Sequence, residues 1–409
     1  MRQFVLPLLV TTMLAAAPAF AQTSPAGSRP SVVTAPPNAP GQQPAFENQT
    51  RAPQPARPAK VTTQTVADDL PRLWAMEFLP DGRMLVTAKA GDMHIVARDG
   101  AAGEAIAGVP KVDADGQGGL LDVALAPDFA ESGTIFFSYA EPRDGGGNGT
   151  SVARARLAME GNSGTLQDVR VIFRQTPAYD GDKHFGSRLA FDRQGRLFVT
   201  VGERSDTPIR DQAQDLSSGL GKVFRINQDG SIPDGNPFAD SAQPAIWSYG
   251  HRNVQSAVVD ADGRLWLVEH GPKGGDELNR PEAGKNYGWP VITYGLTYGG
   301  RPVGQGITAK EGMEQPIYYW DPVIAPSGMA LYTADAIPEW KGALLIGGLV
   351  SQGLVILHLD GDRVAAEERV PLDARIRDVK VGPDGAVYAV TESRGWGSGS
   401  TILRIASGS

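Results

Sequence analysis

One histidine stands in a segment, DKHFGSRLAF (residues 182–191), that combines charged groups, a glycine and an alternating apolar run. A neutral imidazole with a pKa of about 6.5 can accept a proton from a hydroxyl group within hydrogen-bond reach. His184 is therefore a candidate general base. From the residues alone, the more ordinary interpretation stays open, which is a histidine satisfied by backbone partners at the end of a strand.

Polar groups and glycines gather in six short segments of the chain. The segments are GQGGLLD (116–122), KHFGSR (183–188), SYGHRNVQ (248–255), EHGPKGGDELN (269–279), GKNYGWP (284–290) and RIRDV (375–379). Arg375 and Arg377 alternate, so both side chains leave one face of a strand, which suits the binding of adjacent carboxylates. Arg252 taken singly is a surface arginine paired with a carboxylate. The pair Asp276 and Glu277 taken singly is a solvated loop.

A repeated phrase indicates which elements position these segments. Each copy has a short apolar strand, a turn with Asp and usually Gly, and a second strand. The copies are MEFLPDGRMLVTAKAG (76–91), VALAPDFAESGTIFFSYA (123–140), LAFDRQGRLFVTVGE (189–203), AVVDADGRLWLVEHG (257–271), VKVGPDGAVYAVTES (379–393) and, with a longer turn, MALYTADAIPEWKGALLIGGL (329–349). Asp caps its own backbone and Gly accepts a positive φ, so each copy is predicted to fold as a hairpin.

The spacing of the copies, about 45 to 80 residues, matches one four-stranded blade with variable loops. Helical periodicity of useful length is absent. The sequence therefore predicts an all-β fold, a six-bladed β-propeller with four-stranded antiparallel blades. The loops of a propeller converge on a central channel mouth, where the polar segments would meet. Propellers serve as binding modules and as enzymes, so the function has to come from the site.

Composition and the N-terminus place the protein in a class. Residues 1–21 have Arg2, a long apolar run and a small-x-small sequence before Gln22, which predicts a cleaved signal peptide and a periplasmic or secreted protein. Residues 22–62 are rich in Pro, Ala and Gln and are predicted to be a disordered tether before a propeller domain at 63–409. No other stretch is long enough to span a bilayer. The net charge of -8 disfavours nucleic-acid partners, and 0 cysteines leave packing and ligands to stabilise the fold.

The order and content of GQGGLLDVALAPDF, HFGSRLAF, WSYGHRN, EHGPKGGDELN, NYGWPVITYG and RIRDV resemble a known family. These motifs are similar to those of the soluble aldose sugar dehydrogenases that depend on pyrroloquinoline quinone (PQQ), the glucose/sorbosone dehydrogenase family. The resemblance extends over residues 70–405. It implies a six-bladed propeller, PQQ in the channel mouth, Ca²⁺, and oxidation of an aldose at C1 to the lactone.

The resemblance assigns roles to several residues. His184 matches the catalytic histidine, which acts as general base. Arg252 matches the arginine beside the reactive quinone carbonyl, where a fixed positive charge stabilises developing negative charge. Asn253 matches a cofactor-binding position, and Gln255 matches a neighbour of less certain role. Gln117 corresponds to a glutamine on the substrate side, although GQGG is also compatible with a simple tight turn.

The resemblance also implies two calcium sites. The backbone carbonyls of Gly271 and Pro272 match those that hold the cofactor-bound Ca²⁺, and hard oxygen ligands of this kind suit the ion. As a Lewis acid the ion would polarise the quinone carbonyl. Asp276 maps near the cofactor. Glu277 and Tyr287 match ligands of a second, structural Ca²⁺.

The remaining cofactor contacts include one departure from the family pattern. Arg375 and Arg377 would bind carboxylates of PQQ. Trp320, in YYWDP, matches an aromatic residue that packs on the cofactor, with a core tryptophan as the alternative. Relatives have a lysine where the segment LLIGGLVSQG places Val350. Its loss weakens PQQ binding unless Lys341 or another cation compensates.

Two other function classes stay open. A calcium-dependent lactonase with a propeller fold would also use His and carboxylates at a channel mouth, but it has no need for three arginines around one anionic cofactor. A non-catalytic propeller that binds glycans or proteins becomes the default if Val350 abolishes PQQ binding. For the enzyme, the expected partners are an aldose sugar and an electron acceptor such as a membrane quinone or a periplasmic cytochrome.

Overall fold

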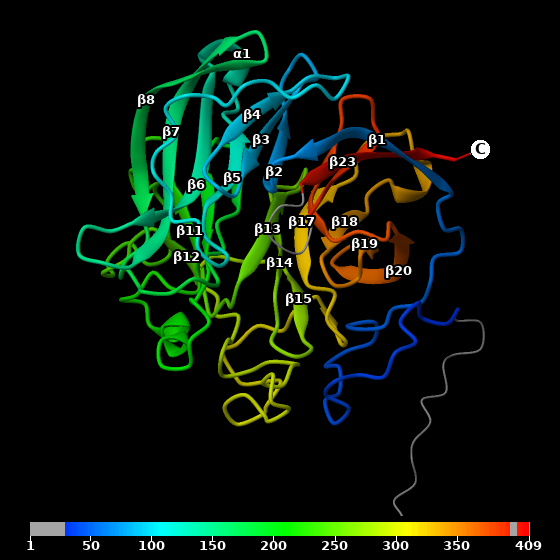
Figure 1. Cartoon of the computed structure of the whole chain (residues 1–409). Coiled ribbons are helices and arrows are strands. Elements are labelled where there is room, and N and C mark those ends of the chain that lie inside the picture. The colour runs from blue at the N-terminus through cyan, green and yellow to red at the C-terminus, as the bar shows by residue number, and fades with distance from the viewer. Residues whose placement is uncertain (1–28, 393–398, 409) are drawn as a thin grey trace, which may run out of the picture.

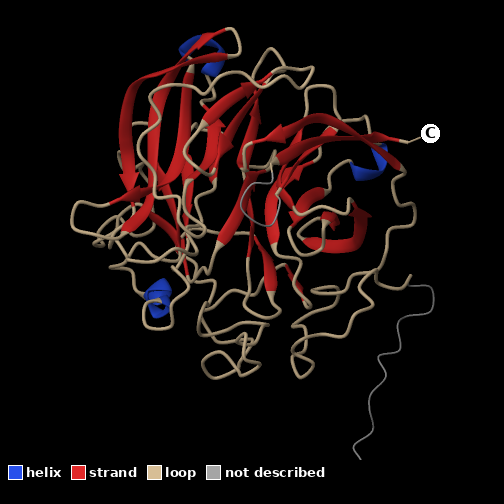
Figure 2. Cartoon of the chain, in the orientation of Figure 1, coloured by secondary structure: helices blue, strands red, loops and turns tan. Residues whose placement is uncertain are grey.

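The computed structural model describes residues 29–392 and 399–408. Six antiparallel sheets stand around a central axis, so the prediction of an all-β, six-bladed propeller is confirmed (Figure 1). Strands dominate the chain, and helices are limited to short turns in its described part (Figure 2). The predicted signal peptide, residues 1–21, lies outside the described residues.

The first strands of the blades contact one another around the axis, so each blade is built from the inside outward. The strands are β2 (Leu73–Phe78), β3 (Met84–Ala88) and β4 (Met93–Val96) in blade 1; β5 (Leu120–Leu125), β6 (Thr134–Pro142), β7 (Asn148–Glu160) and β8 (Ser163–Arg174) in blade 2; β9 (Leu189–Phe191), β10 (Leu197–Val201), β11 (Lys222–Ile226) and β12 (Ile246–Tyr249) in blade 3; β13 (Val254–Val259), β14 (Leu265–Glu269), β15 (Asp276–Asn279) and β16 (Tyr318–Trp320) in blade 4; β17 (Pro326–Leu331), β18 (Leu344–Gly348), β19 (Gly353–Asp360) and β20 (Arg363–Pro371) in blade 5; and β21 (Ile376–Val381), β22 (Val387–Thr391), β23 (Ser400–Ser407) and β1 (Val61–Leu70) in blade 6. The helical turns are α1 (Phe129–Ser132), η1 (Arg210–Gln214) and η2 (Pro338–Trp340).

The ring is closed by pairing of the chain ends. β1 is the outermost strand of blade 6 and runs antiparallel to β23, from Val61 opposite Ser407 to Leu70 opposite Ser400. Blade 1 has three regular strands, and an irregular segment takes the fourth place. There the N–H of Gly103 donates to the carbonyl of Ile95 at 2.9 Å. Because the last blade needs strands from both ends of the chain, closure ties the whole ring together.

The predicted hairpins form the two inner strands of each blade. In the β9–β10 turn the carboxylate of Asp192 accepts the N–H groups of Gln194 and Arg196, both at 2.9 Å, and Gly195 has a φ of 75°. This is the Asp-capped, glycine-containing turn that the sequence predicts. Two turns are longer: α1 lies in the β5–β6 turn and η2 in the β17–β18 turn. Every residue of β3, β10 and β18 is buried, so the hydrophobic core lies between neighbouring blades.

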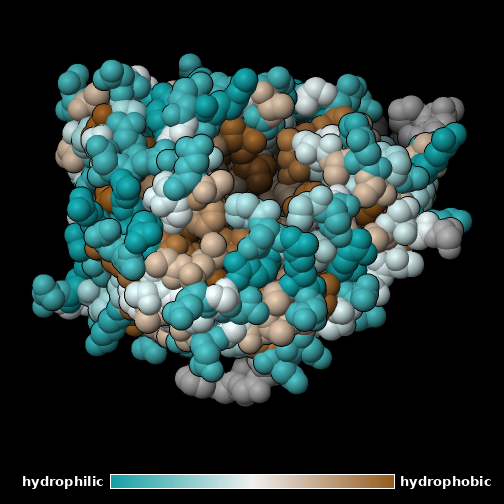
Figure 3. All heavy atoms as spheres, turned by 90° about the horizontal axis from the view of Figure 1, so that it is seen from above, coloured by the Kyte–Doolittle hydropathy of each residue, from teal (hydrophilic) through white to brown (hydrophobic). Residues whose placement is uncertain are grey.

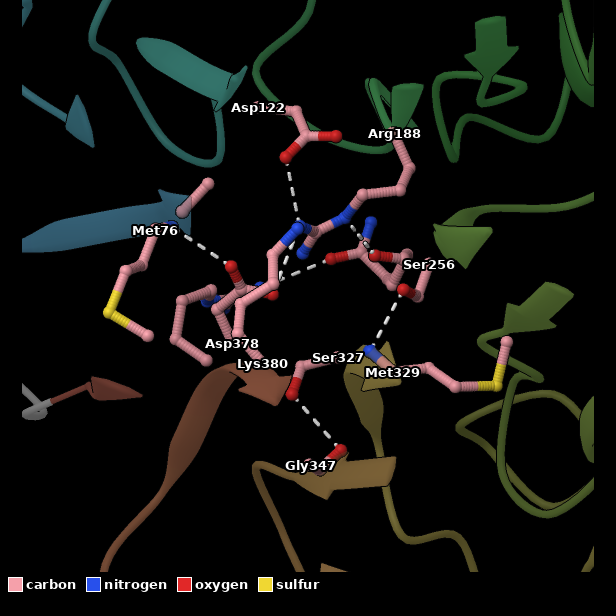
Figure 4. A network of polar contacts seen from close by, with 12 residues as sticks. Met76, Asp122, Arg188, Ser256, Ser327, Met329, Gly347, Asp378 and Lys380 are labelled. Carbon is pink, nitrogen blue, oxygen red and sulfur yellow. Dashed lines mark hydrogen bonds and ion pairs between the residues drawn. The ribbon is translucent and has the colours of Figure 1, made fainter. Parts of the chain in front are cut away.

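A buried arginine fills the axis of the ring (Figure 4). The guanidinium of Arg188 bonds Asp122 of blade 2 at 2.9 Å and Asp378 of blade 6 at 3.0 Å. Its Nε donates to the carbonyl of Gln255 of blade 4, and its charge lies 4.4 Å from the ring centroid of Trp74 in blade 1. One side chain therefore joins four blades, and its charge is balanced by carboxylates where water is excluded.

The segment before β1 departs from the disordered tether that its composition predicts. The N–H groups of Asn38 and Ala39 donate to the carboxylate of Asp321 at 2.8 and 2.9 Å, and Arg51 donates to the carbonyl of the same residue. Gln49 is fully buried and bonds the carbonyl of Pro316. These contacts correct the prediction for residues 29–60, which form a strap across blades 4 and 5 (blue in Figure 1). The sequence did not predict this strap, because hydrogen bonds to residues far away in the chain hold it in place, and it has no apolar periodicity.

The two ends of the channel differ in character. The end that carries the hairpin turns is hollowed at its centre, and the wall of the hollow is apolar (Figure 3). Polar residues gather at the other end. There, loops lead into the first strand of each blade and out of the second. Within the described residues, no helix is long and apolar enough to cross a membrane.

Candidate active site

A cavity of about 300 Å³ opens at the end of the channel away from the hairpin turns. Five of the six polar segments contribute residues to its wall; only GKNYGWP (284–290) does not. The other lining residues are neighbours of these segments in the fold. The lining residues are Arg72, Trp74, Lys89, Gly116, Gln117, Leu121, Phe185, Gly186, Asn253, Gln255, His270, Ala325, Leu349, Val350, Arg375, Arg377 and Glu392. The predicted substrate residue Gln117 and the predicted cofactor residues Asn253, Arg375 and Arg377 are therefore brought together.

His184 lies in the loop before β9, directly ahead of the cavity-lining Phe185 and Gly186. It is 5% exposed and has a φ of 49°, a left-handed conformation that is uncommon for residues other than glycine. Its backbone N–H donates to Oε1 of Gln117 at 2.9 Å. Gly202 makes the conformation possible, because a Cβ there would lie 2.1 Å from the carbonyl oxygen of His184.

Glu203 orients the imidazole of His184. The Nδ1 atom of the ring lies 2.8 Å from Oε1 of Glu203, which is fully buried two residues after the end of β10. A carboxylate accepts hydrogen bonds, so Nδ1 carries the hydrogen and Nε2 keeps the lone pair that can accept a proton. Burial has the largest effect on the pKa of His184 and lowers it, and the charge of Arg252 lowers it further. Glu203 raises this pKa, but the net shift is downward. Glu203 was missed by the sequence analysis, because a glutamate at the end of a strand gives no signal of its partner.

A second histidine lines the cavity but is a weaker base. His270 Nε2 donates to the carbonyl of Pro326 at 2.7 Å, and burial lowers its pKa to about 3. Unlike His184, it has no carboxylate partner among the described residues to stabilise a proton on the ring. It therefore stays neutral at ordinary pH, and His184 remains the candidate base.

Arg252 lies between the histidine site and the predicted calcium carbonyls. Its Nε is 4.0 Å from Oε1 of Glu203, and its Nη1 donates to the carbonyls of His270 and Gly271 at 3.0 and 2.8 Å. The Nε atom is buried and finds no hydrogen-bond partner among the described residues. A buried guanidinium with an unused donor can stabilise a negative charge that develops beside it.

The arginine pair of the RIRDV segment faces the cavity together with a glutamate. Arg375 and Arg377 bond Oε2 of Glu392 at 3.1 and 2.8 Å, and Arg72 bonds Oε1 at 2.6 Å. Burial opposes the ionisation of Glu392, but the arginines outweigh it and lower its pKa to about 2. Glu392 is thus ionised at any physiological pH and holds three cations at one side of the cavity.

Asp276 supports the loops around the cavity without lining it. One carboxylate oxygen accepts the N–H of Gly271 at 2.8 Å, and the other accepts those of Ile324 and Ala325 at 2.9 and 2.7 Å. Burial raises its pKa to about 7. Since Ala325 lines the cavity and Gly271 carries a predicted calcium ligand, Asp276 fixes the backbone on which both depend.

Two buried carboxylates meet near the predicted second calcium site. The side-chain amide of Asn279 donates to Glu269 at 2.9 Å and to Glu277 at 3.0 Å. Burial and the charge of Glu269 raise the pKa of Glu277 well above its usual value. The hydroxyl of Tyr287 donates to the carbonyl of Arg280 and accepts the N–H of Glu282, so its backbone carbonyl is the more available calcium ligand. Glu269 was not identified from the sequence as part of this site.

Three residues that the sequence analysis considered for cofactor contacts lie in different surroundings. Trp320 is 2% exposed and packs in the core against Tyr318, so its position matches the alternative of a core tryptophan; Trp74 is the tryptophan in the cavity wall. Val350 does line the cavity, and 48% of it is exposed. Lys341 pairs with Asp335 on the exposed surface and does not line the cavity. It therefore does not supply the missing charge.

A serine, a histidine and a glutamate also form a hydrogen-bonded chain below the cavity. Ser248 Oγ lies 2.9 Å from Nε2 of His251, and Nδ1 of His251 lies 2.9 Å from Glu269. The order resembles a hydrolytic triad. However, Ser248 and His251 are both fully buried, so no substrate reaches the serine. The chain instead fixes Glu269, whose other oxygen accepts the backbone N–H of Arg252 at 2.7 Å.

Comparison with known proteins gives consistent matches over this fold and site. The family model described as glucose/sorbosone dehydrogenase matches residues 69–402. The chain is 44% identical to the aldose sugar dehydrogenase YliI of Escherichia coli over 82% of this chain and 91% of that protein. It is 25% identical to quinoprotein glucose dehydrogenase B of Acinetobacter calcoaceticus over 81% of this chain and 85% of that protein. The PQQ-bound aldose sugar dehydrogenase of Streptomyces coelicolor superimposes with a TM-score of 0.71 at 30% identity, over 86% of this chain and 99% of that one.

Proposed function

This chain belongs to the glucose/sorbosone dehydrogenase family of oxidoreductases, and we propose that it oxidises an aldose sugar at C1 to the lactone, with PQQ as the oxidant. The observation that carries the proposal is a base that lies next to a cavity with an anion site in its wall, directly before the cavity-lining Phe185 and Gly186. The base is His184, oriented by Glu203. The anion site is the arginine pair Arg375 and Arg377 in the wall of the same cavity.

The residues present fit an anionic, planar cofactor. PQQ carries three carboxylates, and the wall offers cationic side chains that are only partly neutralised by Glu392. The buried Nε of Arg377 has no hydrogen-bond partner among the described residues, as is true of the Nε of Arg252. Asn253 and Gln255 add amide groups at the cavity wall. Such unused donors are costly in a closed protein interior and suit a bound anion.

When bound, PQQ supplies a two-electron acceptor for the hydride that leaves C1 of the sugar. The protein provides the proton transfer and the electrostatics. His184 Nε2 accepts the proton of the C1 hydroxyl, and Glu203 stabilises the imidazolium that results. Arg252 supplies a fixed positive charge that costs no reorganisation during the reaction. Loss of a C1 hydride and the hydroxyl proton together leaves the lactone, so atoms and electrons balance.

We further propose that the protein binds Ca²⁺. Among the described residues no group of three or more His, Cys, Asp or Glu side chains is arranged to hold a metal. The ligands would therefore be mainly carbonyls, those of Gly271 and Pro272 near the cofactor and of Tyr287 in the second site, with Glu277 as a carboxylate and water completing the shell. Irregular oxygen sites of this kind suit Ca²⁺ better than Mg²⁺.

Export and electron transfer complete the proposal. The N-terminal sequence supports transport to the periplasm or secretion, where a membrane quinone or a periplasmic cytochrome would reoxidise the cofactor. The lactonase alternative is disfavoured, since the arginines of the cavity have no task in lactone hydrolysis.

The test is reconstitution of purified protein. PQQ and Ca²⁺ are added to the apoprotein, and reduction of a dye is followed over a panel of aldoses, with lactone hydrolysis measured in parallel. We expect dye reduction that requires both PQQ and an aldose. PQQ binding without turnover of any sugar would favour the non-catalytic alternative, and lactone hydrolysis without dye reduction would favour the lactonase.

A further inference from the structure

Two cations lie side by side at the cavity end of blade 1. Arg72 directly precedes β2, and Lys89 directly follows β3. The backbone N–H of Lys89 donates to the carbonyl of Arg72 at 2.8 Å, so the two residues are neighbours across the strand pair. Both line the cavity. Like charges placed opposite each other on adjacent strands are destabilising unless an anion lies between or beside them.

Only one of the two cations has an ionic partner in the described part of the chain. Arg72 pairs with Glu392 at 2.6 Å. The ammonium of Lys89 donates to the backbone carbonyl of Ala114, a neutral acceptor, and forms no ion pair with a described residue. Burial lowers the pKa of Lys89 and the charge of Arg72 lowers it further, while the more distant charges of Asp115, Glu392 and Asp113 only partly oppose this shift. A charged group held beside another cation in a partly dehydrated wall is ready to bind an anion.

The position of Lys89 relative to the other cations is informative. Blade 6 contributes Arg375 and Arg377, and it stands between blade 5, which carries Val350, and blade 1, which carries Lys89. The arginine pair is thus flanked by an uncharged side chain on one side and by an extra cation on the other. Four cations and the single carboxylate of Glu392 leave a net charge of +3 among the described charged residues of the wall. This charge equals that of the three carboxylates of PQQ.

We propose that Lys89 binds a carboxylate of PQQ from blade 1 and supplies the cationic charge that Val350 does not. The inference rests on the proposed function. Lys89 lies outside the six polar segments of the sequence, and TAKAG at the end of a strand is typical of an ordinary solvated turn. Arg72 positions Glu392 between the two groups of cations, and Lys89 is the cation of the wall that forms no ion pair with a described residue.

The test measures binding rather than turnover. PQQ is titrated into apoprotein at fixed Ca²⁺ and without sugar, and the quenching of tryptophan fluorescence is followed, since Trp74 lines the cavity. In Lys89→Gln the amide can still donate to Ala114, but the charge is lost; we expect PQQ to bind about tenfold more weakly, with a shallower salt dependence. Lys89→Arg keeps the charge, and we expect its affinity to lie within about threefold of the parent.

Lys341→Gln is the matched control, because Lys341 is an exposed lysine remote from the cavity; we expect no change in its PQQ affinity. The melting temperature of apo Lys89→Gln should equal or exceed that of the parent, which separates lost binding from lost folding. Parent-like PQQ affinity in Lys89→Gln would overturn the assignment while leaving the proposed function intact. A raised KM for the sugar with unchanged PQQ affinity would also overturn it. If the parent itself bound no PQQ, both the assignment and the proposed function would fail.

Discussion

The imidazole of His184 and the carboxylate of Glu203 are joined by a hydrogen bond of 2.8 Å between Nδ1 and Oε1, and both groups are buried. This contact fixes the ring tautomer, because a carboxylate accepts and Nδ1 must donate. It leaves Nε2 as the only ring atom that can take up a proton. The same carboxylate lies 4.0 Å from the guanidinium of Arg252, so Glu203 contacts both the proposed base and the proposed source of positive charge.

Removing the base should affect turnover and spare binding. We expect His184→Ala to lower kcat by about 10²-fold or more, which is the contribution of a positioned general base. PQQ affinity and melting temperature should stay close to those of the parent, because the side chain contacts Glu203 rather than the cavity cations. Steady-state dye reduction and a PQQ titration measure both quantities. Comparable kcat in variant and parent would remove His184 from the mechanism.

The charge of Glu203 should be visible in the pH profile. The pKa of His184 is held below 6.5 by burial and by Arg252, so kcat/KM of the parent should be level at neutral pH and fall only in acid. Glu203 raises that pKa, so in Glu203→Gln it should fall further, and the acid limb should move to lower pH while the plateau of kcat drops about tenfold or more. An acid limb that stays in place, or moves to higher pH, would show that another group titrates.

Whether a site residue could be predicted from the sequence depends on whether local or distant contacts fix its position. The hairpins were predictable, because local Asp and Gly side-chain chemistry fixes turns such as that at Asp192. Arg375 and Arg377 were predictable, because strand alternation places them on one face. Glu203 and Lys89 were not, because no local pattern shows that Glu203 bonds the ring of His184 or that Lys89 enters the cavity wall. Trp320 was ambiguous in sequence, and only the packing around it in blade 4 decides where it lies.

The strap over residues 29–60 shows the same limit. Its Pro, Ala and Gln content gives no apolar periodicity, and that composition is typical of a tether. Its order comes from Asp321, whose carboxylate accepts two strap N–H groups from 282 and 283 residues away in the chain. Composition indicates whether a segment can form a hydrophobic core of its own. It does not indicate whether side chains of a folded domain can form hydrogen bonds with the backbone of that segment.

Chelation should test the proposed calcium sites. We expect EGTA to lower activity and melting temperature, and Ca²⁺ to restore both better than Mg²⁺. The physical reason is the pair Glu269 and Glu277, which repel each other unless a cation or a proton intervenes. Glu277→Gln should melt at the parent's temperature or higher without Ca²⁺ and should gain less from added Ca²⁺. Calorimetric melting of both proteins with and without the ion measures this; melting and activity that ignore exhaustive chelation would contradict the assignment.

The axial arginine should matter for stability rather than for chemistry. Arg188→Met removes the guanidinium bonded to Asp122 and Asp378 and leaves only the more distant charge of Lys380 near these buried carboxylates, so we expect the free energy of unfolding to fall by about 3 to 5 kcal/mol. Arg404→Met is the matched control, because its pair with Asp384 is partly exposed and should contribute about 1 kcal/mol or less. Urea unfolding of the three proteins compares them. A loss below about 1 kcal/mol for Arg188→Met would mean that the aspartates find other partners.

Restoring a lysine at position 350 should strengthen cofactor binding. Val350 lines the cavity with 48% of its surface exposed, and the preceding carbonyl of Leu349 accepts a hydrogen bond from Arg375 at 3.0 Å. An ammonium at position 350 therefore adds positive charge beside the arginine pair at a small cost in desolvation. We expect Val350→Lys to bind PQQ about tenfold more tightly, an effect that shrinks as salt rises because the site is partly solvated.

The gain in PQQ affinity from Val350→Lys should be larger in the Lys89→Gln background, where the wall has lost a charge. PQQ titrations of the single and double variants at fixed Ca²⁺ measure these effects. Unchanged or weaker affinity in Val350→Lys would show that position 350 does not face a carboxylate of the cofactor.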